Sequence, residues 1–147
     1  MDMSNKDYDK FVQARAKKSP IVKDCVFAFV IGGAICVLGQ AILDGFTALG
    51  LEKTDAGTAT SVCLVALSAL LTGLNLYNKL ARFGGAGTLV PITGFANAVV
   101  SPALEFKTEG FILGVGAKMF TIAGPVIVYG VSASVVYGLI YWITTLF

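Results

Sequence analysis

The sequence predicts an all-α integral membrane protein with three to four membrane-crossing helices, a Gly/Pro-broken re-entrant segment and an N-terminal amphipathic helix. Of the 147 residues, 56% are hydrophobic and only 14% are charged, which is not the composition of an average soluble domain. Four uncharged runs reach or approach the roughly 20 residues that a spanning helix needs. They are residues 25–43, 56–78, 83–104 and 119–147. We therefore divide the chain into a cytoplasmic N-terminal segment, residues 1–24, and a polytopic membrane domain, residues 25–147.

The N-terminal segment is basic and predicts a short amphipathic helix. It carries six lysines and arginines against four aspartates. Ser4 is typical of a helix start, and Pro20 ends the helix. Tyr8, Phe11 and Val12 fall on one face, which fits a helix lying on the cytoplasmic leaflet of the lipid bilayer with its basic residues near anionic lipid. The alternative is a solvated N-terminus that only fixes the orientation of the protein.

Charged residues between the runs predict the orientation of the spans. The loop over residues 44–55 holds three acidic residues and one lysine, whereas Lys79 and Arg82 follow the second run. Because basic loops stay in the cytoplasm, we expect the N-terminus and the loop at residues 79–82 inside, and the loop over residues 44–55 outside.

The first run contains residues that suit contact with another helix. Gly32, Gly33 and Gly39 would let a second helix approach closely. Gln40 is costly in lipid unless it faces protein or water. We predict these four residues as helix-packing positions.

The second run carries Ser68, Thr72 and Asn75, whose spacing places them on one broad helix face. They could face protein or a polar path. The alternative for the two hydroxyls is a hydrogen bond to the carbonyl four residues earlier in the same helix, which has no further meaning.

The third run does not have the composition of an ordinary spanning helix, because four glycines and Pro91 fall within residues 83–97. In hydrocarbon, a broken helix survives only where protein or a water-filled cavity satisfies its backbone. We expect a short helix from Thr88 to Ala103 with Pro91 in its first turn. The length of this run permits a crossing, but its four glycines and Pro91 favour a re-entrant form. Broken helices of this kind build solute sites in channels and transporters. The residues predicted to border a solute path are Gly84, Gly85, Gly87, Pro91, Thr93, Asn97 and Lys118.

Lys118 is the lone charge between a short apolar piece, residues 110–117, and the final run. Its ammonium could reach the membrane interface, or it could attract anions at the mouth of a pore. Tyr137, Tyr141 and Trp142 in the final run suit an interfacial aromatic belt.

Residues that carry catalysis or bind metals are missing from the sequence. There is no histidine, no cluster with metal-ligand spacing and no nucleophile beside a base. The glycines at 84–87 do not form a P-loop, because no Lys-Ser/Thr pair follows them. We expect no enzyme activity, no cofactor, no bound metal and no nucleic-acid partner.

These residues resemble the SpoVA family of spore-forming bacteria. The resemblance covers nearly the whole chain and rests on residues 32–40, 79–97, 101–110 and 114–125. The second stretch, KLARFGGAGTLVPITGFAN, is long and specific. The resemblance implies a multi-pass subunit of the inner spore membrane that moves dipicolinic acid, with Ca²⁺, during sporulation and germination. It also implies other SpoVA proteins as partners, especially the AE-type paralogue.

Two other functions compete with transport. The chain could be a structural scaffold subunit of a membrane pore complex whose path is formed mainly by other subunits, with its glycines as packing positions. A membrane enzyme that acts on lipid is disfavoured by the missing catalytic cluster.

Overall fold

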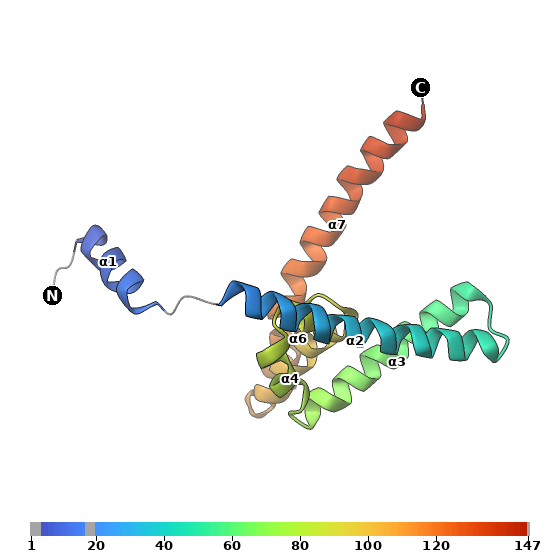
Figure 1. Cartoon of the computed structure of the whole chain (residues 1–147), viewed down its shortest axis with the longest axis horizontal. Helices are drawn as coiled ribbons and strands as arrows, with labels where there is room; N and C mark the ends of the chain where they lie inside the picture. Colours follow the sequence, from blue (N-terminus) through green and yellow to red (C-terminus); the bar gives the residue numbers. More distant parts are fainter. Residues whose placement is uncertain (1–3, 17–19, 147) are drawn as a thin grey trace.

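The computed structural model describes residues 4–16 and 20–146 (Figure 1). Within these ranges the chain is helical and forms no strand. Three stretches, α2, α3 and the run Phe111–Thr145, are long and apolar enough to cross a membrane. The predicted all-α membrane fold is confirmed. The elements in chain order are α1 (Asn5–Arg15), α2 (Ile21–Ala48), α3 (Lys53–Gly73), α4 (Tyr77–Gly84), α5 (Ala86–Leu89), α6 (Ile92–Glu105), the 3₁₀ turn η1 (Lys107–Glu109), the π-helix η2 (Phe111–Gly116) and α7 (Ala117–Thr145).

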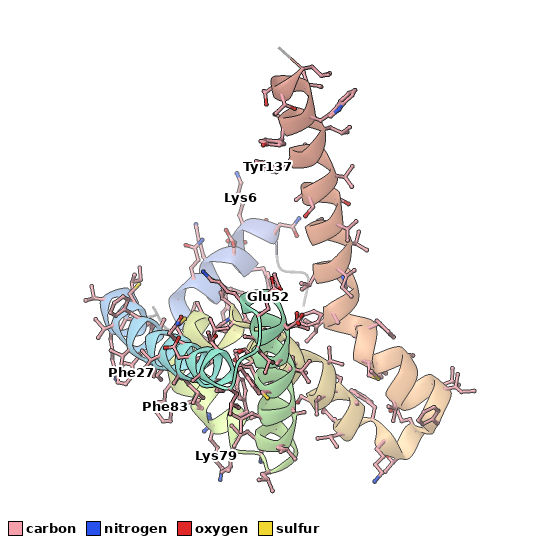
Figure 2. All side chains as sticks on the ribbon, turned by 90° about the vertical axis from the view of Figure 1, so that its right-hand side faces the viewer. Lys6, Phe27, Glu52, Lys79, Phe83 and Tyr137 are labelled. Carbon is pink, nitrogen blue, oxygen red and sulfur yellow. The ribbon has the colours of Figure 1, made fainter. Side chains whose placement is uncertain are left out.

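α2 and α3 form a helical hairpin, and Figure 2 shows Glu52 and Lys79 beyond opposite ends of α3. None of the residues of α2 is buried, whereas α3 buries one stripe of side chains. Residues four apart lie on the same side of a helix, so this stripe is the face that α2 and α6 cover. Its members are mostly small or polar: Ala56, Thr60, Leu64, Ser68 and Thr72.

α3 ends earlier than the sequence predicted, because Asn75 adopts a left-handed conformation with φ 57°. The Leu76 N–H donates to the Leu71 carbonyl and the Asn75 N–H to the Thr72 carbonyl, both at 2.9 Å. These two bonds form a Schellman motif, in which Asn takes the position usually held by Gly. The prediction that Asn75 shares a helix face with Ser68 and Thr72 is therefore wrong, because Asn75 lies just beyond α3 and terminates it.

α6 runs parallel to α3. The Ser68 hydroxyl donates to the Thr93 carbonyl at 2.6 Å, and Thr72 pairs with Asn97 at 2.9 Å, so both contacts join residues 25 apart. The end of α6, at Glu105, shares a pocket with the loop that follows α3. The chain between α3 and η1 thus enters and leaves on the same side of the bundle, which is the path that a re-entrant segment would take.

The broken segment differs in detail from the single helix predicted over Thr88–Ala103. The structure has two helices, because the chain leaves helical geometry at Pro91, which has φ −62° and ψ 162° and is the N-cap of α6. α6 ends at Glu105, two residues beyond the predicted end at Ala103, and Pro102 lies inside it. The loss of one N–H there is tolerated in a helix packed on both sides by α3 and α7.

η2 continues directly into α7, giving a helical run of 35 residues. Gly110, with φ 97°, turns the chain, and Gly114 packs against the Phe106 carbonyl, where a side chain would have no room. We expected a separate apolar piece ending at Lys118. Instead the helix passes through Lys118, whose ammonium lies 4.3 Å from the centre of the Phe106 ring.

The second half of α7 leaves the bundle (Figure 1). Pro125 lies inside the helix, and the N–H that it lacks is a common cause of bending. Figure 2 shows the first and last parts of α7 running in different directions, with Tyr137 and its neighbours projecting freely. This half is apolar and exposed on every side, as expected of a helix that lipid or another subunit covers.

α1 lies apart from the bundle (Figure 1) and is exposed along its length. The Arg15 guanidinium lies 4.0 Å from the centre of the Phe11 ring, on the apolar face. α1 ends at Arg15, before the predicted end at Pro20, while α2 already begins at Ile21. Lys17 and Lys18 of the predicted basic segment, and the last residue of the final run, lie outside the described residues.

Candidate solute path around the re-entrant segment

Gly85 breaks the chain between α4 and α5. Its backbone has φ 47° and ψ −124°, a conformation that residues with a side chain rarely adopt. A Cβ built on Gly85 would meet no atom within 4 Å. The backbone, rather than crowding, therefore requires glycine here, and one face of the break is open.

The glycines on either side of Gly85 pack against α2. A Cβ on Gly87 would overlap the Ala28 carbonyl, and a Cβ on Gly32 would lie 3.1 Å from the Gly87 Cα. A Cβ on Gly84 would lie 3.1 Å from the Ile31 side chain. Gly87 thus brings the backbones of the re-entrant segment and α2 into direct contact, while Gly84 makes room for the Ile31 side chain.

A chain of buried polar groups ties α3 to α6. The Thr72 hydroxyl lies 2.7 Å from the Ser68 carbonyl and 2.9 Å from the Asn97 amide oxygen. One hydroxyl proton cannot serve both acceptors, so the pair is best satisfied when the Asn97 amide is turned to donate to Thr72. Ser68 does not bond its own helix, as the alternative expected, but donates to the Thr93 carbonyl. For Thr72 the bond within the helix is present.

Tyr77 completes this polar network from α4. Its hydroxyl donates to the Thr88 carbonyl at 2.7 Å and lies 2.9 Å from the Thr93 hydroxyl. The Thr88 hydroxyl donates to the Gly85 carbonyl at 2.9 Å. The Tyr77 hydroxyl thus joins the Thr88 carbonyl to the Thr93 hydroxyl.

Every buried side-chain nitrogen and oxygen in the described part of the chain has a hydrogen-bond partner. In hydrocarbon this is what allows a broken segment to persist. Thr93 is closed inside the network at 5% exposure, and its polar groups are already paired. Asn97 is half-buried and has one face free to border open space.

Two pockets meet at Gly85. The first, which we name the inner pocket, has a volume of about 240 Å³ and is bordered by Gly85, Tyr77 and Asn97, among others. The second, the mouth pocket, has a volume of about 410 Å³ and lies between the start of α2 and the end of α4. Asp24 and Arg82 line the mouth pocket, so it carries one charge of each sign.

The structure places the predicted path residues in four different surroundings. Gly85 and Asn97 border the inner pocket, while Gly84, Gly87 and Thr93 are packed or bonded internally. Pro91 caps α6 at the tip of the re-entrant segment. Lys118 lies at the corner of α6 and α7 over Phe106 and borders neither pocket.

The predicted helix-packing residues also differ in their surroundings. Gly32 faces Gly87 of α5, and Gly39 faces Leu64 of α3, where a Cβ would lie 3.4 Å from the side chain. Gly33 has no atom within 4 Å of a built Cβ. Gln40 donates to the Asp44 carboxylate at 2.8 Å on the exposed surface of α2.

Asp24, Tyr77, Arg82 and Thr88 belong to the site but were not predicted. In the sequence, the charges of Asp24 and Arg82 indicate only the orientation of the spans. Tyr77 and Thr88 could have been recognised by their hydroxyl groups, which stand in a largely apolar stretch. A hydroxyl buried there requires a hydrogen-bond partner. Among the described residues, no three His, Cys, Asp or Glu side chains lie together where they could hold a metal ion.

Comparison with known proteins places the chain in a family. Residues 24–140 match the SpoVAC/SpoVAEB sporulation membrane protein family. The chain is 44% identical over 135 residues to Stage V sporulation protein AC of Bacillus subtilis (strain 168), and this alignment covers 91% of the chain and 90% of that relative. No solved structure matches the chain. The resemblance seen in the sequence is confirmed, and the chain belongs to the SpoVAC/SpoVAEB family of sporulation membrane proteins.

Proposed function

We propose that this protein is a subunit of a channel or transporter that moves dipicolinic acid, with Ca²⁺, across the inner spore membrane during sporulation and germination. The observation that carries the proposal is the meeting of two pockets at Gly85, in a chain from a family of sporulation membrane proteins. A solute path needs irregular backbone that lines a cavity at membrane depth, and the re-entrant segment combines both features.

The charges of the mouth pocket support the choice of solute. Dipicolinate is a planar dicarboxylate, and a guanidinium binds carboxylates through two parallel hydrogen bonds. Arg82 offers that group, while Asp24 offers the carboxylate oxygens that Ca²⁺ prefers. One group of each sign at the mouth suits an acid that travels with its cation.

A complete path requires more protein than this chain supplies. Both pockets are open at the surface of the bundle, and in a bilayer these openings would face lipid without a neighbour. We propose that other SpoVA proteins, especially the AE-type paralogue, close them. Gly33, with open space beside it, offers a place where a neighbouring helix could approach closely.

A scaffold role is the second candidate, and the packing of the predicted path residues favours it. Gly84 and Gly87 contact α2, and the hydrogen bonds of Thr93 are satisfied internally. If these residues only hold the re-entrant segment in place, the path runs mainly through other subunits.

Flux from liposomes separates the two candidates. The protein would be reconstituted with its AE-type paralogue in liposomes loaded with dipicolinate, and release would be followed by the luminescence of external Tb³⁺. Arg82→Gln should lower the release rate because it removes the cation of the mouth pocket. Lys79→Gln, on the same helix but outside both pockets, is the matched control. Equal rates for both variants and the unmodified protein would favour the scaffold role.

A further inference from the structure

A groove lies between α6 and the helical run formed by η2 and α7. It has a volume of about 540 Å³ and is walled by Val99, Val100 and Ala103 of α6 on one side and by Phe111, Val115 and Met119 of η2 and α7 on the other. It shares no lining residue with the mouth pocket or the inner pocket. It is therefore a feature separate from the two pockets that meet at Gly85.

The groove has one charged residue at one end, and its other lining residues are apolar. Lys107, in the turn η1, is the one charged residue among those that line it. The neighbouring Glu105 borders a different pocket, on the α3 side of α6. From Val99 to the end of α6 at Glu105 is six residues, or about 9 Å at the rise of a helix, so the apolar lining extends away from Lys107.

The position of Lys107 in the bundle fixes the orientation of the groove. The end of α6 lies beside the loop after α3, on the side of the bundle that carries Lys79 and Arg82. The charged turn η1 must sit at the membrane–water interface, because three successive polar residues would be costly in hydrocarbon. The apolar walls then extend into the leaflet on that side.

The groove is also a built feature rather than a loose gap. Gly110, with φ 97°, turns the chain at its charged end, and Gly114 packs on the Phe106 carbonyl. The π-helix η2 forms part of one wall, and short π-helices are frequent at functional sites. Phe111 is 84% exposed, so an occupant would cover a large apolar side chain that the fold leaves open.

We propose that this groove binds an anionic phospholipid. One acyl chain lies along the walls formed by α6, η2 and α7, and the phosphate group lies at the Lys107 ammonium. The apolar length, the single cation at the interfacial end and the absence of a carboxylate from its described lining match an amphiphile of this charge.

The test is lipid binding by the intact protein in nanodiscs that contain equal amounts of phosphatidylglycerol and phosphatidylcholine. Native mass spectrometry would count the lipids that stay bound. The unmodified protein should retain phosphatidylglycerol in preference to phosphatidylcholine, and Lys107→Gln should reduce that preference about fivefold. Lys79→Gln, a cation on the same membrane face outside the groove, should leave it unchanged.

A second variant tests the apolar walls. Ala103→Leu narrows the groove and should reduce the number of retained lipids of both kinds, whereas Ala133→Leu on the exposed half of α7 should not. Equal retention of the two lipids by the unmodified protein would overturn the proposal. So would an unchanged preference in Lys107→Gln, or displacement of the lipid when the paralogue binds. None of these outcomes depends on dipicolinate flux.

Discussion

Replacing Gly87 by Ala should separate α5 from α2. A Cβ at this position would overlap the Ala28 carbonyl and would lie 2.8 Å and 2.9 Å from the Ala28 carbonyl carbon and Cα. Ordinary carbon contacts are about 3.5–4.0 Å, so the two backbones must move apart by about 1 Å or more. The clashing atoms belong to the backbone and cannot rotate away as a side chain could, so the helices α5 and α2 have to move apart.

The cost follows from the packing that is lost. Overpacking a well-packed contact costs about 1–3 kcal/mol, and a radial gap of about 1 Å forfeits up to half of the dispersion energy of the neighbouring contacts. The gain in helix propensity from Gly to Ala, at most about 1 kcal/mol, offsets only part of this. We therefore expect a net loss of about 1–2 kcal/mol in the free energy of unfolding.

The assay is thermal unfolding in detergent of three single variants. Gly87→Ala and Gly32→Ala, on opposite sides of the same contact, should both lower the midpoint, because the Gly32 Cβ would lie 3.1 Å from the Gly87 Cα. Gly33→Ala, one residue further along α2, should not lower it, since nothing lies within 4 Å. Equal losses in Gly33→Ala and Gly87→Ala would refute the reasoning.

Four further outcomes follow from the same structure. Tyr77→Phe should cost about 1–3 kcal/mol of stability, because it leaves the buried Thr93 hydroxyl without its partner, whereas the exposed Tyr137→Phe should change the unfolding midpoint little. Lys118→Gln should leave dipicolinate flux unchanged and cost about 0.5–1 kcal/mol from the lost contact with Phe106; a lower flux would instead place this residue at a pore mouth. Cysteines introduced at Lys79 and Glu105 should react with an impermeant thiol reagent from the cytoplasmic side and one at Glu52 from the other, and labelling of Glu105 with Glu52 would contradict the re-entrant topology. Gly33→Leu should abolish copurification with the paralogue while the chain still folds, and intact copurification would exclude this face as a subunit contact.

The membrane spans could be predicted from the sequence because hydropathy and length determine them locally. The break in the third run was also predictable, since four glycines and Pro91 cannot continue a lipid-exposed helix. The residues at which the helices end were harder to predict from the sequence. Asn75 ends α3 through backbone bonds that depend on a single left-handed residue, and Lys118 does not end a helix because Phe106 covers its ammonium.

The site was predictable only in part, for a physical reason. Gly84, Gly85 and Gly87 look alike in the sequence, yet two of them touch α2 and one faces open space. Whether a glycine packs against α2 or borders open space depends on how α5 packs against α2. No local sequence pattern encodes that contact. Tyr77 was missed for the same reason, because its partners lie 11 and 16 residues further along the chain.

The most direct test of the proposed path uses a native cysteine. Cys25 is exposed and lines the mouth pocket, whereas Cys36 and Cys63 are exposed but border neither pocket. The protein would be reconstituted with its paralogue, and an anionic methanethiosulfonate would be attached to Cys25 in a variant with Cys36→Ala and Cys63→Ala. We predict that modification of Cys25 blocks most dipicolinate release, while modification of Cys36 or Cys63, each in a variant that keeps only that cysteine, does not. Full release after complete modification of Cys25 would contradict a path through the mouth pocket.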